Sequence, residues 1–189
     1  PSIVNLNLPI RVFAGNVANA TAIIVQTASA AAFNEGDGNN KMDTLSWSAE
    51  GSVAGVTTEA AILSIRNDPQ KGGVINRARR ILLGISMFCT TAAGTTPVTI
   101  RLKRNVTLGG APAFAVIGSD SVASKDTAGT TVSGGTPLST FQIARGDGVF
   151  IPTAEFDIVD APGDVLTITA FAVAPAVDVT ASLLWREEF

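Results

Sequence analysis

The stretch GDVLTITAFAV at residues 163–173 and the stretch AVDVTASLLWR at residues 176–186 indicate the fold of this chain. Apolar and polar residues alternate along the second stretch, and this period of two is typical of a half-buried β-strand. The first stretch begins at a Gly-Asp turn and is apolar or small on both faces. We therefore expect it to lie inside a β-sandwich or at a subunit contact, and we expect the two strands to lie antiparallel to each other.

The same period recurs along most of the sequence, with Gly, Pro, Asn and Asp at most of the breaks. Further strands are predicted at residues 2–13, 20–27, 43–49, 52–56, 60–66, 81–90, 98–103, 113–117, 138–143, 149–151 and 155–159. Many short strands with frequent turns predict an all-β fold, a jelly-roll-like antiparallel β-sandwich. Residues 74–80 are expected to form at most a helical turn, and residues 119–137 an exposed loop, because this loop has almost no large apolar side chain.

The first forty residues differ in character from the rest. Apolar residues alternate near the start of the chain, and the polar run Asn34–Asn40 follows a small-residue segment. We interpret residues 1–40 as an extended N-terminal arm and hinge, and residues 41–189 as the β-sandwich. The arm is expected to pack on a neighbour or on a larger assembly. The alternative is an N-terminal strand added to the main sheet.

Composition limits the classes of partner. Apolar residues make up 46% of the 189 residues and charged residues 15%, so the chain can bury a core, and its low charge suggests a partly covered surface. The formal net charge is −3, and Arg11 is the one basic residue before Lys41. We therefore expect no nucleic-acid partner. The apolar runs are too short for a membrane helix, so no membrane partner is expected either.

Positive charge is concentrated in one window of 28 residues. The window contains Arg77, Arg79, Arg80, Arg101, Lys103 and Arg104. Arg101 and Lys103 fall on one strand face, and Arg79 with Arg104 could extend a patch that meets acidic groups on a partner. The alternative is that these side chains are solvated strand faces.

The residue types that most enzymes need are scarce. The chain has no histidine and no tyrosine, which removes histidine-based triads and the commonest zinc ligand. Cys89, the only cysteine, excludes an intrachain disulfide and is expected to be a buried, inert thiol. Asp157, Asp160 and Asp164 could form a hydrolytic carboxylate pair, but turn formation around Pro162 explains them more simply. We expect no enzyme, no cofactor and no metal.

Three short patterns have alternative interpretations. The tripeptide Arg145-Gly146-Asp147 is the sequence that integrins recognise, but a hairpin turn is favoured. Glu35 and Asp37 begin a calcium-like alternation that lacks the required glycine and glutamate. Trp47 and Trp185 could stack on a sugar ring, although core or interface anchors are the favoured roles.

The segments Gly163–Ile168 and Ser182–Arg186 look like the closing pair of strands in trimeric viral jelly rolls. The Ala-, Thr- and Gly-rich, Cys-poor character of the whole chain resembles the capsid cement (decoration) proteins of tailed bacteriophages. This resemblance implies a homotrimer on the outside of an icosahedral head that clamps neighbouring major capsid subunits. It includes no motif, so it assigns no site residues.

The resemblance therefore implies a structural virion protein on the capsid exterior, made in the host cytoplasm, whose partners are its own copies and the major capsid protein. The expected contact residues are Ile3, Leu6, Leu8, Ile10 and Val12 in the arm and Arg79, Arg101, Lys103 and Arg104 in the basic window. The alternative is a phage tail-fibre or host-glycan-binding module. A glycan-processing enzyme on the same fold is disfavoured by the lack of His, Tyr and a convincing carboxylate pair.

Overall fold

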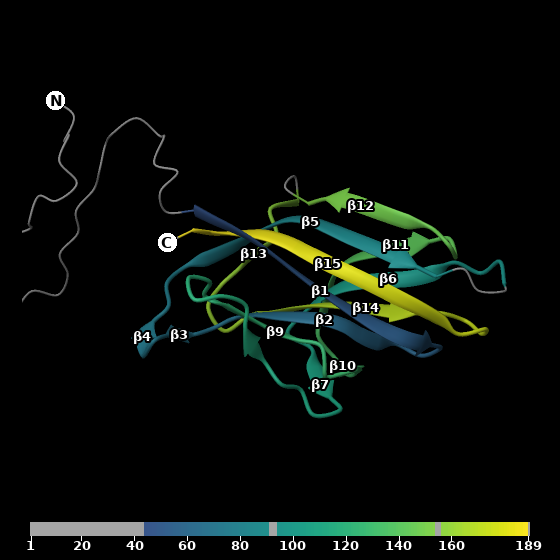
Figure 1. Cartoon of the computed structure of the whole chain (residues 1–189), viewed down its shortest axis with the longest axis horizontal. Helices are drawn as coiled ribbons and strands as arrows, with labels where there is room; N and C mark the ends of the chain where they lie inside the picture. The colour runs from purple at the N-terminus through teal and green to yellow at the C-terminus, as the bar shows by residue number, and fades with distance from the viewer. Residues whose placement is uncertain (1–43, 91–93, 154–155, 189) are drawn as a thin grey trace, which may run out of the picture. The chain divides into compact units, whose positions relative to one another are not determined.

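A computed structural model describes residues 44–90, 94–153 and 156–188. This part of the chain forms two large antiparallel β-sheets that pack face to face and a separate two-stranded sheet (Figure 1). The arm expected at residues 1–40, with its strands at 2–13 and 20–27, lies outside the described residues. The described residues contain no helix long and apolar enough to cross a membrane.

The first sheet has the order β1-β15-β5-β12, with β13 also paired to β5. Its strands are β1 (Thr44–Val56), β15 (Val177–Glu188), β5 (Arg79–Cys89), β12 (Gly148–Pro152) and β13 (Val159–Asp160). The second sheet has the order β11-β6-β14-β2 and continues through β10 and β7, while β9 pairs with β2 and β8. Its strands are β11 (Thr136–Ile143), β6 (Val98–Arg104), β14 (Val165–Phe171), β2 (Ala60–Asn67), β10 (Thr131–Ser133), β7 (Thr107–Gly109), β9 (Ala123–Asp126) and β8 (Ala115–Val116).

The two groups β1-β15-β5-β12 and β11-β6-β14-β2 form an eight-stranded jelly roll, because most successive long strands lie in opposite sheets. This confirms the predicted fold class. The last two strands, which were expected to lie antiparallel to each other, do not pair. The strand β14 lies between β6 and β2 in one sheet, and β15 lies between β1 and β5 in the other. In a jelly roll the chain crosses between the sheets at this point.

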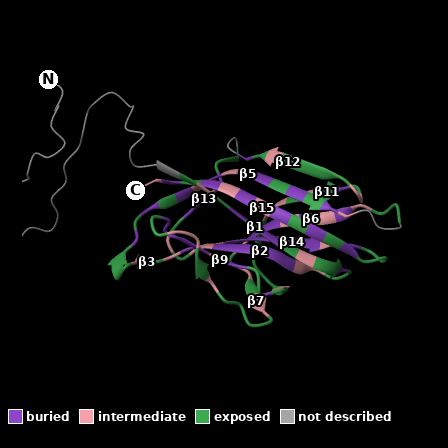
Figure 2. Cartoon of the chain, in the orientation of Figure 1, coloured by how far each residue is buried: buried purple, intermediate pink, exposed green. Residues whose placement is uncertain are grey.

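The alternation in the last strand correctly predicted its buried face. Val177, Val179, Ala181, Leu183 and Trp185 are all buried between the sheets (Figure 2). They pack with residues from both sheets, among them Leu63, Ile65, Leu82, Ile85, Met87, Ile100, Leu102 and Ile168.

The strand β14 is buried on both faces within the chain itself. On its outer face the Thr167 hydroxyl lies 2.9 Å from the Ser64 hydroxyl, and the Thr169 hydroxyl donates to Glu59 at 2.8 Å. Thr167 and Thr169 are almost completely buried. Of the two alternatives for this strand, the interior of the sandwich is therefore the observed one.

Gly51 explains why β1 is one strand and not the two strands predicted at 43–49 and 52–56. A Cβ atom at Gly51 would lie 2.3 Å from the carbonyl oxygen of Ile62. The glycine therefore permits a close approach of β1 to the backbone of β2 and does not break the strand.

The helical turn expected at residues 74–80 is wrong. Gln70–Lys71 (β3) and Val74–Ile75 (β4) form a two-stranded hairpin. Gly72 and Gly73, with φ angles of 57° and 81°, form its two-residue turn. Such a turn requires positive φ at both positions, so the Gly-Gly pair was the stronger signal.

The exposed loop expected at residues 119–137 is also wrong, because it contains β9 and β10. Ala123 and Ser124 are buried in β9 against β2, where small side chains suffice because the backbone makes the contact. The Asp126 carboxylate accepts backbone N–H groups from Ala113, Ala128 and Gly129 at 2.6 to 3.2 Å.

The prediction of a strand at residues 155–159 is wrong for residues 156–158, which the structure describes. Residues 156–157 form a turn, in which Asp157 has a φ of 45°. Strand pairing begins only at Val159.

We predict that Gly51→Ala lowers the free energy of unfolding by about 1–3 kcal/mol, because the added methyl group forces β1 away from β2. Ser48→Ala, at an exposed position of the same strand, is the matched control and should change it by less than about 0.5 kcal/mol. Urea unfolding curves measure both. Equal midpoints for the two variants would show that the close approach is not required.

Candidate functional surfaces

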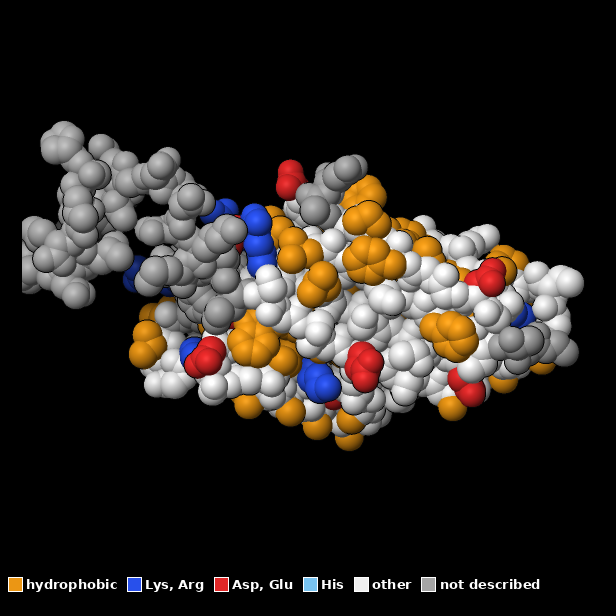
Figure 3. All heavy atoms as spheres, turned by 45° about the horizontal axis from the view of Figure 1, so that its top comes forward, with side chains coloured by type: hydrophobic (Ala, Val, Ile, Leu, Met, Phe, Trp, Pro, Cys, Tyr) orange, Lys and Arg blue, Asp and Glu red, His pale blue; other side chains and the backbone are white. Residues whose placement is uncertain are grey.

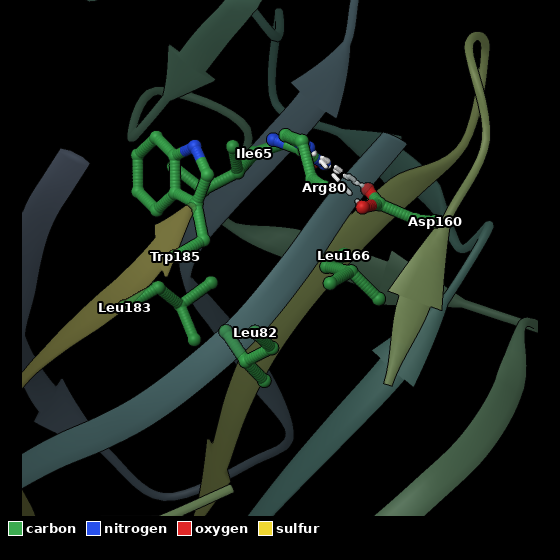
Figure 4. A pocket seen from close by; sticks show the side chains of 7 residues that line it. All are labelled: Ile65, Arg80, Leu82, Asp160, Leu166, Leu183 and Trp185. Atoms are coloured by element: carbon green, nitrogen blue, oxygen red, sulfur yellow. Dashed lines mark hydrogen bonds and ion pairs between the residues drawn. The ribbon is translucent and has the colours of Figure 1, made fainter. Parts of the chain in front are cut away.

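Arg80 and Asp160 form an ion pair in the interior, with side chains only 2% and 1% exposed. Arg80 Nε donates to the two carboxylate oxygens of Asp160 at 3.2 and 3.0 Å, and Nη2 contacts the same carboxylate. Nη2 also donates to the backbone oxygen of Ile65 at 3.2 Å. Because Ile65 lies in β2 and Arg80 in β5, this one guanidinium joins the two sheets (Figure 4).

Apolar side chains surround this pair. The Trp185 ring lies 5.8 Å from Arg80 Cζ, and Leu82, Leu166 and Leu183 line a small hollow beside it (Figure 4). Burial raises the pKa of the Asp160 carboxyl, and Arg80 counters part of that rise. Arg80 is therefore neither a docking residue nor a solvated strand face.

Glu187 is a second buried acidic side chain, near the same end of the sandwich. One carboxylate oxygen accepts from the Ser121 hydroxyl at 2.7 Å and from Trp185 Nε1 at 3.2 Å, and the other accepts from the Val122 N–H at 3.0 Å. These bonds attach the segment before β9 to β15.

Burial of Arg80 and Glu187 was not predicted from the sequence, although a signal is present there. Arg80 is two residues from Leu82, and Glu187 is two residues from Trp185, so both share the inward-facing period of their strands. Both side chains would nevertheless be expected at the surface, because isolated charged residues are rarely fully buried.

Asp164, a second aspartate of the 157–164 cluster, has a structural role. The Asp164 carboxylate accepts from Asn105 Nδ2 at 2.9 Å and from the Ala161 N–H at 3.1 Å. Burial acts to raise the pKa of Asp164, but these two hydrogen bonds hold it below its usual range. The turn interpretation is confirmed for Asp164, whereas Asp160 is held by Arg80.

Cys89 is buried in β5, as expected, and burial raises the pKa of its thiol. Within the described residues, no three His, Cys, Asp or Glu side chains are grouped so that they could hold a metal ion. Glu35 and Asp37 lie outside those residues. Trp185 is buried, and Trp47 is half-buried. Trp47 packs against Gly118, because a Cβ atom at Gly118 would lie 2.8 Å from the Trp47 ring.

The Arg145-Gly146-Asp147 tripeptide connects β11 to β12, which lie in different sheets, so the hairpin interpretation is wrong. The Arg145 guanidinium donates to the backbone oxygens of Thr96, Pro175 and Val173 at 3.0, 2.8 and 2.5 Å. This arginine joins its own loop to the segment before β6 and to the loop between β14 and β15. Its guanidinium is therefore already engaged within the chain.

The structure brings together only two of the four predicted basic contact residues. Arg101 Nη1 and Lys103 Nζ lie 3.3 and 3.4 Å from the same oxygen of Glu59 on the outer face of β6. Arg104 Nη2 instead donates to the backbone oxygen of Val159 at 2.7 Å, and Arg79 is exposed on β5 in the other sheet. Glu59 therefore offsets part of the positive charge of the remaining pair.

Exposed apolar side chains gather over β5 and β12 (Figure 3). Phe88 and Phe150, which are 49% and 57% exposed, share the outer face of the sheet, whereas Val149, 38% exposed, lies opposite buried Met87 on the other face. We call these three side chains at the sheet edge the β12 edge surface. A Cβ at Gly84 would lie 2.6 Å from the Phe150 ring, so this glycine seats the ring on the sheet. The arm residues Ile3, Leu6, Leu8, Ile10 and Val12 lie outside the described residues.

A separate polar hollow lies along β1. It is lined by Glu50, Gly51, Ser52, Lys125, Thr127 and Thr180. Its hydroxyl and charged groups could form hydrogen bonds with a polar ligand, but none of the described residues that line it is aromatic.

No model of a known protein family matches the sequence. No curated protein matches it either. Among solved structures, the fold is similar to a chain from a study titled "Bacillus endospore appendages form a novel family of disulfide-linked pili". The two chains are 16% identical, the match covers 77% of this chain and 88% of the other, and the TM-score is 0.37.

We predict that Arg80→Met lowers the free energy of unfolding by about 3–5 kcal/mol, because it leaves the Asp160 carboxyl buried without its partner. Arg79→Met, at the exposed neighbouring position, is the matched control and should have little effect. The double variant Arg80→Met/Asp160→Leu should recover much of the loss. Urea unfolding decides, and a tolerated Arg80→Met would show that the pair does not hold the sheets.

The ion pairs at Glu59 predict that the stability of the fold depends on pH. Burial acts to raise the pKa of Glu59, but the Thr169 hydrogen bond and the Arg101 and Lys103 charges lower it below 4.5. A lowered folded pKa contributes stability above the unfolded pKa, and this is lost as the pH falls through the folded value. We expect Glu59→Gln to cost up to about 1 kcal/mol at pH 7 and nothing near pH 2. A difference that persists in acid would contradict this assignment.

Proposed function

We propose that this chain is a structural virion protein, a cement or decoration protein that binds the outside of a phage capsid shell as a homotrimer and stabilises it. The observation that carries the proposal is the β12 edge surface, a group of exposed apolar side chains in a chain of low charge. Apolar surfaces of this kind mark sites of protein contact. The resemblance to cement proteins supplies the class of assembly.

The proposed attachment relies on apolar burial more than on charge. Fully burying a Phe side chain contributes roughly 1.5–3 kcal/mol, and three copies in a trimer bind the shell together. Arg101 and Lys103 supply little steering because Glu59 lies against both. The role proposed is therefore mechanical and does not include catalysis, a cofactor, nucleic acid or a membrane.

Attachment is tested with shells assembled from the major capsid protein of the same virus. We predict that Phe150→Ser lowers the affinity of the full chain for shells at least tenfold in co-sedimentation, because it removes the largest exposed ring of the surface. Phe156→Ser is the matched control, since Phe156 is also 57% exposed but lies outside the β12 edge surface. Equal binding by both variants, or no binding by the unchanged protein, would overturn the proposal.

The polar hollow on β1 favours a second candidate, a phage tail-fibre or host-glycan-binding module. Binding of purified host cell-wall glycan, lost on Lys125→Ala but not on Phe150→Ser, would support this candidate over the capsid role. The capsid proposal predicts no glycan binding by the unchanged protein.

A further inference from the structure

The strand β12 presents unpaired backbone groups at the edge of its sheet. Among the described residues, only β5 pairs with it. The Cys89 N–H donates to the Asp147 oxygen at 3.0 Å, and the Thr153 N–H donates to the Leu83 oxygen at 2.9 Å. Antiparallel ladders alternate, so Gly148 and Phe150 must direct their N–H and C=O groups away from β5.

This edge lacks the protection that other edges of the sandwich have. The edge strand β11 contains Pro137 and a register shift between Pro137 and Ser139. The strand β1 exposes Ser46, Ser48 and Glu50. The strand β12 carries no charge, exposes Val149 and Phe150, and has its one proline at its end. Unprotected apolar edges of this kind accept an added strand.

The chain contains a segment suited to this edge at residues 4–12. Its apolar residues occupy every second position from Val4 to Val12, with Asn5, Asn7, Pro9 and Arg11 between them. Pro9 has no N–H, so a strand formed here could pair fully along only one of its edges. Such a strand would end the sheet, because its outer edge would pair poorly with another strand.

The length of the spacer allows a neighbouring copy to be the donor. Thirty-one residues, 13–43, separate this segment from Thr44, the first residue of β1. Thirty-one residues reach at most about 100 Å when fully extended, whereas β1 and β12 are three strand spacings apart, about 15 Å. The spacer is therefore long enough to reach a neighbouring copy, which the proposed homotrimer supplies.

We propose that residues 4–12 of one copy add as a strand to the β12 edge of a neighbouring copy. Donation from each copy to the next is a head-to-tail contact, which forms a ring when the rotation between copies closes and a filament when it does not. The proposed homotrimer corresponds to the ring. This inference rests on the homotrimer in the proposed function and does not depend on capsid binding. It assigns the oligomer contact to backbone hydrogen bonds at Gly148 and Phe150.

The orientation of the added strand follows from Pro9. The N–H groups that face β12 should be those of residues 4, 6, 8, 10 and 12, because Pro9 interrupts the other edge. Residues that exchange hydrogen bonds across a ladder place their side chains on the same face. The apolar side chains of the arm should therefore lie beside Phe150.

Cysteine cross-linking of the full chain tests this contact. Phe150→Cys is combined with a cysteine at each position from 4 to 12 in turn, and the purified protein is oxidised with oxidised glutathione without capsids. We expect cross-linked dimers and trimers on non-reducing gels, at least fivefold stronger at even than at odd positions. Native Cys89 is buried, and each single variant controls for its reaction. Val116→Cys, at a 69% exposed apolar position of β8, replaces Phe150→Cys in the matched control series.

Equal cross-linking from position 116, or no alternation along the arm, would overturn strand addition. Cross-links confined within single chains would show that the arm returns to its own β12 and would overturn the exchange between copies. Cross-links in the variants, together with an unchanged protein that fails to bind shells, would leave strand addition standing and refute the capsid role. The reverse result, shell binding without cross-links, would refute only strand addition.

Discussion

The buried contact among Arg80, Asp160 and the Ile65 carbonyl is the constraint on which the rest of the sandwich depends. It is the place where one side chain of β5 bonds both to β13 in its own sheet and to β2 in the opposite sheet. Glu187 adds bonds to Ser121 and Val122 near the same end. Removing one member of a buried pair leaves an uncompensated charge. This end of the sandwich is therefore held together by buried polar contacts that tolerate few substitutions.

The β12 edge has the opposite character. Its outward-directed backbone groups have no partner among the described residues, and Phe88 and Phe150 are half exposed. A sheet edge with these properties is a liability for a free monomer and a suitable contact in an assembly. The physical contrast between a closed polar end and an open apolar edge supports a role in assembly, with binding carried by surface contacts.

The alternation of apolar residues was enough to predict the all-β class and the buried face of β15, because a period of two determines which side chains point inward. It could not predict which strands pair, since β14 and β15 are successive in sequence but lie in opposite sheets. It failed at Gly51, whose role depends on the Ile62 carbonyl. The close approach of two backbones and the crossing of the chain between sheets depend on residues far apart in sequence. A local pattern of apolar residues therefore cannot predict them.

The candidate surface was predicted less well than the fold. The basic window was treated as one surface, but the structure buries Arg80 and sets Arg101 and Lys103 against Glu59. The residues at 149–151 were predicted as a strand, but their place at a sheet edge and the seating of Phe150 on Gly84 depend on the pairing of β12 with β5. Exposure of an apolar residue is a property of the whole fold.

The most direct test of the central claim, that copies associate through the β12 edge, is the mass of the protein in solution. Sedimentation equilibrium of the unchanged chain should return three times the 19.3 kDa chain mass. Phe150→Pro removes an outward-directed N–H while sparing the bonds to β5, so it should return the monomer mass with an unchanged far-ultraviolet circular dichroism spectrum. A monomeric unchanged protein, or a Phe150→Pro variant that stays trimeric, would contradict the account.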